Sequence, residues 1–419
     1  MNDTETKPAP MTDEELVAIL NSLPKQPKRK PPNGLRLSLD PNACRKAITF
    51  VAGVIPNRTT LPVLSMMHLA GNGSTILRGT DLDVTLSSEL DVKAKIDGEC
   101  LLPKAALLGA LKASKKRLEI AMGEKLMADV VADGFKQTVP TLSVDEYPPG
   151  LEVKPEITLQ VSATQLRQAL KQIEMAQSTD ESRYVLNGVF FHVNPHDLTM
   201  VATDGRRLHR THIVRSDAAQ EGQIMDAGDG PAEQPKQAPD APGFIVPSRG
   251  IDHILRLPVE RSTDILFIEA ETKDRNYATL RYGSHTITTK LVEGNYPNYR
   301  QVIPSEFKEV VRLEADAFAT AVRNISTVVT EKSNSVKLKL KRNRMELTAS
   351  SPELGDAKAE LATNYRGADM SIAFNPEYVL DIAAASKGAE CDLKLVDELS
   401  PGVFTGGNLL CVVMPMRLS

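Results

Sequence analysis

The sequence predicts an α+β protein made of three copies of one helix–hairpin–helix–hairpin unit. Three observations predict it. An amphipathic helical segment recurs three times, two strands of alternating polarity follow it each time, and a further strand then enters a second helix through a proline. Because the order of the blocks is the same in each copy, we expect each unit to place antiparallel sheet on one side and two helices on the other.

Apolar residues at helical spacing predict the helices of the three units. The first helix of each unit is expected at residues 41–55, 162–177 and 314–329. The second is expected within residues 100–114, 243–257 and 372–386, where Pro103, Pro247 and Pro376 lie at or near the first helical turn. Proline is tolerated there because the first N–H groups of a helix have no partner inside it.

Apolar and polar residues that alternate with a period of two, around turn residues, predict the strands. The first pair is expected within residues 64–86, 186–211 and 336–361, and Thr80, Thr203 and Thr348 are taken to mark the same point in the three copies. The last pair is expected within residues 136–150, 284–299 and 409–419. The predicted domains therefore run 35–150, 151–304 and 305–419.

Two stretches fall outside the repeat. Residues 1–34 are rich in proline and charge and are predicted to be a disordered tail. Within them, 12–24 has the pattern of a short helix, either a frayed surface helix or a docking helix for a partner. Residues 216–242 have no periodicity and many Pro, Gly, Ala and Gln, so we expect a flexible insert in the second unit.

Composition limits the class of protein. No apolar run approaches the ~20 residues of a membrane span, and the four cysteines sit singly among apolar neighbours, which favours buried, reduced thiols and a cytoplasmic protein. The chain has a net charge of −4. The six predicted helices nevertheless sum to about +7, which suits helices that face phosphates. Most of that excess comes from the second helix of the first unit, counted as 103–117, through Lys112, Lys115, Lys116 and Arg117, which could equally be a solvated helix end.

No catalytic or metal constellation stands out. The nucleophile elbow, the Walker loop and the dinucleotide fingerprint are all missing from the sequence. Asp81 and Asp83 would point to one face of a strand with no third ligand, and the four histidines between 192 and 212 are not at zinc spacing. In VATDGRRLHR (201–210), Asp204 is expected to form a turn with Gly205. We therefore predict no catalytic residues, no metal and no cofactor.

The chain from about 36 to 419 resembles the bacterial DNA polymerase III beta subunit, the sliding clamp family. The matching stretches occur in all three units and in the same order: NRTTLPVLS (57–65), RGTDLDV (78–84), SRYVLNGVFF (182–191), VATDGRRL (201–208), FIVPSRG (244–250), TTKLVEGNYPNYRQVIP (288–304), FNPEYVLD (374–381) and CVVMPMRL (411–418).

The resemblance implies a homodimeric ring that closes head to tail, with domain 1 of one protomer against domain 3 of the other. Twelve helices would line a hole through which duplex DNA passes without sequence-specific contacts. Such a protein tethers the replicative polymerase, conferring processivity, and has no catalysis of its own. Two alternatives stay open: a metal-dependent phosphodiester-acting enzyme that uses Asp81 and Asp83, and a peptide-binding scaffold that does not load on DNA.

The resemblance also implies two sets of site residues. A peptide cleft between domains 2 and 3 would receive the polymerase III alpha subunit, the clamp loader and other proteins that carry the clamp motif. Its expected residues are Arg183, Leu186, Thr203, Gly205, Arg206, Arg207, Leu208, Tyr365, Val412, Met414, Pro415, Met416 and Arg417. Expected DNA contacts are Arg58 and Tyr184 by motif, and Lys112, Lys115, Lys116, Arg167 and Lys171 by charge alone. The sequence departs from the family pattern at Arg206, where histidine is common, and at Val185, where a second tyrosine is common.

Overall fold

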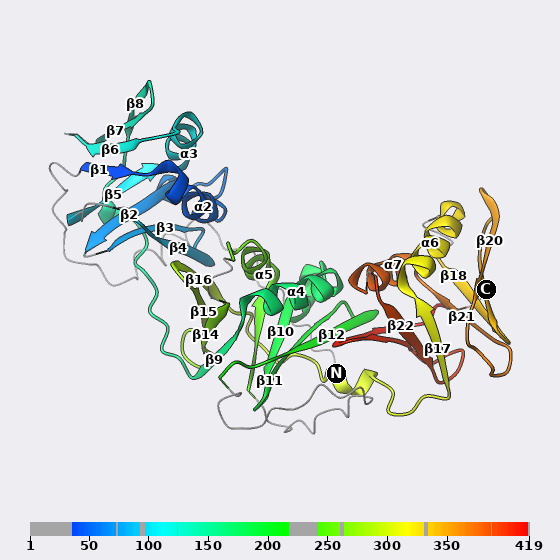
Figure 1. Ribbon diagram of the computed structural model, residues 1–419. Coiled ribbons are helices and arrows are strands. Elements are labelled where there is room, and N and C mark those ends of the chain that lie inside the picture. Colours follow the sequence, from blue (N-terminus) through cyan, green and yellow to red (C-terminus); the bar gives the residue numbers. More distant parts are fainter. Residues whose placement is uncertain are drawn as a thin grey trace. The chain divides into compact units, whose positions relative to one another are not determined.

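The computed structural model describes residues 36–72, 74–92, 97–123, 125–217, 242–259, 264–330, 334–386 and 388–417. The predicted tail (1–34) and nearly all of the predicted insert (216–242) lie outside these residues. The chain divides into two compact units, and Figure 1 labels their helices and strands. Unit 1 extends to Ala163 and includes Asp252–Leu291, and unit 2 consists of Thr164–Ile251 and the residues from Val292 onward.

Unit 1 contains an eight-stranded and a four-stranded antiparallel sheet. The larger has the order β5 (Asp97–Pro103), β2 (Met66–Asn72), β3 (Thr75–Thr80), β4 (Val84–Leu90), β16 (His285–Lys290), β15 (Tyr277–Tyr282), β14 (Ile265–Glu271) and β9 (Ile157–Ser162). The smaller has the order β1 (Arg36–Leu39), β6 (Leu118–Met122), β7 (Met127–Ala132) and β8 (Phe135–Pro140). Helices α2 (Pro41–Ala52) and α3 (Lys104–Ala113) pack against strands of these sheets.

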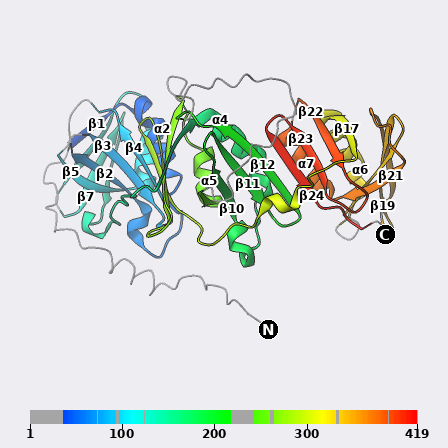
Figure 2. The ribbon, with the colours of Figure 1, turned by 90° about the horizontal axis from the view of Figure 1, so that it is seen from below.

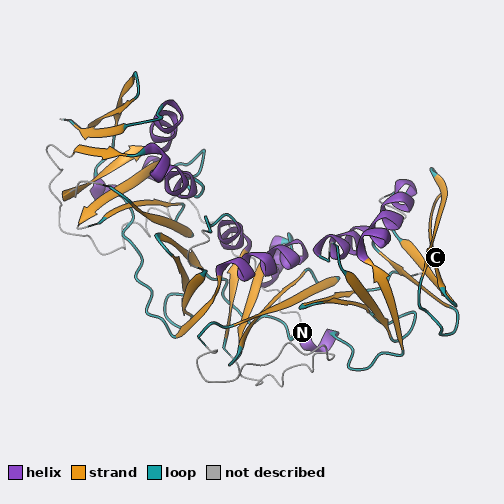
Figure 3. Cartoon of the chain, viewed as in Figure 1, coloured by secondary structure: helices purple, strands orange, loops and turns teal. Residues whose placement is uncertain are grey.

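Unit 2 repeats this plan. Its larger sheet has the order β13 (Gly243–Pro247), β10 (Gly188–Val193), β11 (Asp197–Thr203), β12 (Arg207–Val214), β24 (Leu409–Val413), β23 (Gly402–Gly406), β22 (Glu390–Leu395) and β17 (Glu309–Glu314). Its smaller sheet has the order β20 (Gly355–Ala362), β19 (Arg344–Ser351), β18 (Val336–Lys341) and β21 (Met370–Phe374). Its helices are α4 (Ala163–Ile173), α6 (Ala315–Ile325) and α7 (Pro376–Ala385), and α5 (Ser248–Leu255) spans the boundary between the units. In Figure 3, α4 and α7 lie on the same face of the larger sheet.

The helices begin where the sequence supplies caps. Asp40 accepts hydrogen bonds from the backbone N–H groups of Asn42 and Ala43, and Pro41 follows it at the first helical position. Asn375 caps α7 in the same way, again directly before a proline. The α+β prediction with two helices per repeat is therefore confirmed. All four cysteines are buried and unpaired, as expected.

Three details of the sequence-based prediction were wrong. Thr348 lies inside β19, opposite Lys358, so it does not mark the strand end that Thr80 and Thr203 mark. The corresponding strand ends at Ser351, whose hydroxyl accepts from the N–H of Glu353. Asp81 and Asp83 lie in the turn between β3 and β4 rather than on a strand, and Asp81 Oδ1 accepts from two N–H groups of that turn.

The third error concerns the cationic helix end. Helix α3 ends at Ala113, so Lys115, Lys116 and Arg117 are not helical. The backbone N–H groups of Lys115 and Lys116 instead bind Asp133 Oδ2, each at 2.7 Å. Within α2 to α7, the α-helices of the described residues, eight basic residues stand against four acidic ones, a smaller excess than expected. It is uneven, because α2, α3 and α4 carry six of the basic residues and none of the acidic ones. No described helix has both the length and the apolar character that a bilayer crossing requires.

Candidate partner-docking site

The loop between β11 and β12 is a tight, fully hydrogen-bonded turn. Thr203 Oγ1 donates to the carbonyl of Arg207 at 2.5 Å and accepts from the N–H of Gly205 at 3.1 Å. Asp204 Oδ1 accepts from the N–H groups of Arg206 and Arg207 at 2.8 and 2.9 Å. Gly205 has φ +85°, a left-handed conformation that glycine adopts without steric cost. Asp204 therefore holds the turn, which agrees with its predicted role.

The C-terminal strand lies beside this turn. In the β12–β24 pairing, Arg207 is opposite Val413 and Leu208 is opposite Val412, and the two strands run side by side in Figure 2. The chain then leaves the strand but stays attached. The N–H of Met414 donates to the carbonyl of Arg206 at 2.9 Å, and the N–H of Met416 donates to the carbonyl of Ala373 in β21 at 2.7 Å.

A buried apolar cluster packs against the paired strands β12 and β24. Its members come from β11, β12, β23, β24 and the segment before β17: Val201, Leu208, Tyr299, Val403, Leu410 and Val412. Ile303 and Phe307 are partly buried against it. Sequence reasoning did not select these two residues, although Ile303 stands at the end of the quoted 288–304 stretch. Leu208 and Val412 therefore form the buried base of the site and are not exposed to a partner.

Exposed apolar and basic side chains border this base. Met414 is 45% exposed and Met416 is 37% exposed, so two large apolar side chains reach the surface within three positions. Arg206 and Arg417 are exposed. Arg183 is also largely exposed and reaches the carbonyl of Asp204 with Nη1 at 3.1 Å. The sequence therefore brings flexible methionines and cationic groups together at one edge of unit 2, a combination suited to an apolar peptide with acidic groups.

Arg207 differs from its neighbours because its guanidinium is already occupied. Only 11% of the side chain is exposed. It forms ion pairs with Asp204 and with Asp381 of α7, and it donates to the carbonyl of Met175. Its guanidinium carbon also lies 4.5 Å from the ring centre of Tyr378. Arg207 thus joins the turn to α7, and this placement does not support a direct contact with a partner.

Tyr365 is also placed differently from the expectation. Its side chain is 1% exposed, and its hydroxyl donates to the carbonyl of Ala368. This placement does not support a role in lining an open cleft. The tyrosine that lies next to the site is Tyr378, which is half-buried under Arg207. It stands in the quoted FNPEYVLD stretch. The matching motif therefore included this tyrosine, although it was not among the expected cleft residues. Leu186 is buried, and Thr203 and Pro415 are half-buried.

Strand β12 continues into a buried histidine. His209 is fully buried, and its Nδ1 donates to the carbonyl of Gln172 in α4 at 3.2 Å. Burial lowers the pKa of His209 to about 4, with a further contribution from the nearby Arg207 charge. The imidazole is therefore neutral at pH 7. It is packed as a structural group and is not accessible as a proton donor or a metal ligand.

The expected DNA-contacting residues occupy both units. In unit 1, Arg58 is exposed in the loop after α2, Lys112 is in the last turn of α3, and Lys115 and Lys116 follow that helix. In unit 2, Arg167 and Lys171 belong to α4, and Tyr184 is 49% exposed. Lys171 is exposed, whereas Arg167 is half-buried. Among the residues that the structure describes, no group of three or more His, Cys, Asp or Glu side chains is placed to hold a metal ion.

Comparison with known proteins assigns the architecture to a class. Models of the DNA polymerase III beta subunit match in order along the chain: the N-terminal domain at 35–152, the central domain at 160–225 and the C-terminal domain at 300–417. The crystal structure of the DNA polymerase III subunit beta from Pseudomonas aeruginosa is 28% identical, with a TM-score of 0.80 over 91% of this chain and 100% of that one. The fold is that of a three-domain DNA sliding clamp.

The curated relatives agree with that class. The beta sliding clamp of Caulobacter vibrioides is 27% identical over 395 residues, covering 92% of this chain and all of the relative. The beta sliding clamp of Pseudomonas putida is 28% identical over 391 residues, with the same coverage. The chain belongs to the bacterial DNA polymerase III beta subunit family, the beta sliding clamps, and its function is that of a DNA sliding clamp.

Proposed function

We propose that the chain closes into a ring as a head-to-tail homodimer, encircles duplex DNA and tethers a replicative polymerase, with no catalytic step of its own. In this proposal the clamp domains run 35–150, 151–304 and 305–419. The observation that carries it is the ordered match of three clamp domains on one chain, together with a fold that repeats one sheet junction in each unit. The protein would be cytoplasmic.

Two edge strands are the proposed dimer contacts. Among the described strands, β8 pairs only with β7, and β20 pairs only with β19. The first four residues of β8 are exposed, and Leu354, which immediately precedes β20, is 56% exposed. An uncovered edge strand offers unpaired N–H and C=O groups to another strand, so soluble proteins usually protect it. Pairing of β8 with β20 of a second copy would satisfy both edges.

The dimer is tested by solution mass. We expect the unmodified protein to be a dimer at micromolar concentration, and Leu354→Asp to shift it toward the monomer. Leu399→Asp is the matched control, because Leu399 is 85% exposed and lies outside both edge strands. A monomeric unmodified protein, or an equal response to the two substitutions, would contradict the proposed contact.

Topological binding to DNA is tested by retention. After loading on nicked circular DNA, the protein should remain bound until the circle is linearised, and then slide off the ends. Basic residues on α2, α3 and α4 supply weak, sequence-independent attraction to phosphates that permits sliding. Equal loss from circular and linear DNA would exclude encirclement and would favour a scaffold that does not load.

The docking site is proposed to receive a short apolar motif of the polymerase III alpha subunit, the clamp loader and other clamp-binding proteins. Met414 and Met416 would hold the apolar anchors, and Arg183, Arg206 and Arg417 the acidic or backbone groups. Removal of residues 414–419 should abolish peptide binding and leave the dimer intact. Met414→Ala should weaken binding about tenfold, whereas Met127→Ala, in unit 1, should not. Unchanged affinity after the deletion would place the site elsewhere.

A further inference from the structure

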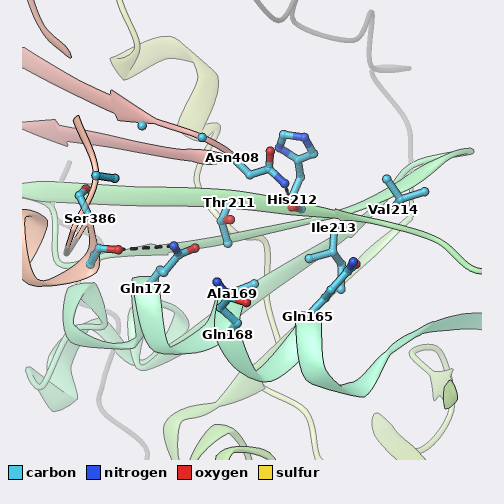
Figure 4. Close-up of a pocket in the computed structure, with 14 residues that line it drawn as sticks. Gln165, Gln168, Ala169, Gln172, Thr211, His212, Ile213, Val214, Ser386 and Asn408 are labelled. Carbon is cyan, nitrogen blue, oxygen red and sulfur yellow. Dashed lines mark hydrogen bonds between the residues drawn. The ribbon is translucent and has the colours of Figure 1, made fainter. Parts of the chain in front are cut away.

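A cavity in unit 2 is lined by residues that do not belong to the docking site. It occupies the space between α4, β12, the end of α7 and the β23–β24 hairpin, and has a volume of about 580 Å³. Figure 4 shows Gln165, Gln168 and Gln172 projecting from one face of α4 toward Thr211 and Ile213 of β12. The opposite wall is formed by the end of α7 and the hairpin. A volume of this size is typical of small-molecule sites.

The lining is polar but uncharged. The three glutamines follow each other at positions i, i+3 and i+7, which places their amides on one helix face. Thr211, Ser386 and Asn408 add further hydrogen-bonding groups. The described lining residues include no Lys, Arg, Asp or Glu, and burial lowers the pKa of His212, which keeps that imidazole neutral. The cavity therefore suits a neutral ligand and offers nothing that would neutralise an anion.

Two of the polar lining side chains are already held by hydrogen bonds to the backbone of neighbouring elements. Gln172 Nε2 donates to the carbonyl of Ala385 in α7 at 3.4 Å, and Asn408 Nδ2 donates to the carbonyl of His212 at 3.2 Å. Ala169, Ile213 and Ala385 add apolar surface. A flat heterocycle with paired donors and acceptors satisfies such a lining, because amide side chains bind the edges of nucleobases through two hydrogen bonds.

One helix cation lies beside a lining glutamine. Lys171 is exposed on α4 and follows Gln168 by three residues, so the two side chains are neighbours on the helix surface. A neutral pocket beside an exposed ammonium group matches the two parts of a nucleotide. We propose that the cavity takes an unpaired nucleobase of DNA, and that Lys171 binds the adjoining phosphate. The inference rests on the proposed function, which brings DNA to the helices.

The test uses the full chain and a short single-stranded oligonucleotide that contains one 2-aminopurine, whose fluorescence reports base burial. An intact oligonucleotide and one with an abasic position serve as competitors, and free adenosine serves as the base without phosphate. We expect the abasic competitor to be about tenfold weaker, and Gln168→Ala to weaken 2-aminopurine binding about tenfold. Gln301→Ala removes an exposed amide outside the cavity and should change nothing.

Lys171→Ala separates the two possible sources of the base. It should weaken oligonucleotide binding but leave adenosine binding unchanged. If adenosine binds in a Gln168-dependent manner while the abasic and intact competitors are equal, the cavity serves free nucleosides and the DNA assignment is overturned. If neither base source depends on Gln168, the cavity proposal fails altogether. Retention of the same variants on nicked circular DNA tests the clamp function separately, because base binding requires no loading.

Discussion

Each eight-stranded sheet contains a junction made of a turn, the strand that follows it and the partner of that strand. The two junctions have the same backbone hydrogen bonds but different side chains. In unit 1 the turn from Thr80 to Val84 precedes β4, which pairs with β16; in unit 2 the turn from Thr203 to Arg207 precedes β12, which pairs with β24. Both turns use the threonine hydroxyl and the aspartate carboxylate in the same hydrogen bonds. Both also place their third residue at positive φ, +81° for Leu82 and +85° for Gly205.

The chain that follows each partner strand is held in the same way. The N–H of Lys290 donates to the carbonyl of Asp83 at 2.8 Å, and the N–H of Met414 donates to the carbonyl of Arg206 at 2.9 Å. The backbone of the two junctions is therefore equivalent, and only the side chains differ. Unit 1 presents Asp83 and Lys290 where unit 2 presents Arg206 and Met414, so only the second junction has the apolar and cationic surface that a peptide requires.

The last residue of the turn is expected to give the largest difference in stability between the two units. Val84 is buried in unit 1, whereas Arg207 in unit 2 links the turn to α7. We expect Arg207→Ala to lower the free energy of unfolding by about 3 kcal/mol, because Asp381 and the carbonyl of Met175 lose their partner. Val84→Ala should cost about 1–2 kcal/mol through lost burial. Chemical denaturation measures both.

A control variant shows whether the destabilisation comes from the contacts of Arg207 with α7 or would follow the removal of any arginine of the turn. Arg206→Ala removes the adjacent, exposed arginine and should stay within about 0.5 kcal/mol of the unmodified protein. If Arg206→Ala and Arg207→Ala destabilise equally, the bridge to α7 contributes no specific stability.

The third strand position is a histidine in unit 2 and a leucine in unit 1, so it predicts a pH dependence from unit 2 alone at this position. His209 corresponds to Leu86, and its pKa of about 4 when folded lies below the ordinary value of about 6.5 expected when unfolded. As pH falls from about 6.5 to 4, the unfolded chain binds a proton that the folded chain does not. The stability should therefore decrease over this range, by about 3 kcal/mol.

Denaturation at several pH values tests this prediction. His209→Leu reproduces the apolar residue of unit 1 and should flatten the decrease, at a cost of about 1 kcal/mol near pH 7 for the carbonyl of Gln172 that loses its donor. His196→Gln, at an exposed histidine of the same hairpin, should leave the pH dependence unchanged. A decrease of unchanged size in His209→Leu would assign it to other groups, such as His192 and His212, whose pKa burial also lowers.

The smallest expected effect concerns the residue at positive φ. Gly205→Ala should cost about 1 kcal/mol, because a Cβ at this φ is strained and would lie 2.8 Å from Arg183 Nη1. Leu82→Gly is the reverse exchange; it relieves strain but removes a side chain packed against the cluster of Val63, Leu64, Leu101 and Tyr147. We expect a net change near zero for Leu82→Gly. A destabilised Gly205→Ala with unchanged peptide affinity would show that the turn supports the fold alone.

The repeat and the junction motifs could be predicted from the sequence because they depend on periodicity and local turn chemistry. Thr80 and Thr203 are recognisable since each is followed by aspartate, whereas the third copy ends at Ser351 with a different turn. Lys115 and Lys116 were misplaced because the end of α3 is set by binding of their N–H groups to Asp133, a contact 17 and 18 residues away in the chain. The burial of Arg207 and Tyr365 depends on partners that no local pattern specifies.

The joining of distant strands also determines when the protein can fold during synthesis. Strand β4 pairs with β16, and Ser88 hydrogen-bonds to His285, 197 residues later. The ribosome must therefore produce nearly 300 residues before the first large sheet can be completed, and until then β4 is an uncovered edge. Non-local pairing of this kind slows folding and exposes strands to aggregation. Expression of the first predicted domain alone would leave β4 paired with β3 but permanently without β16.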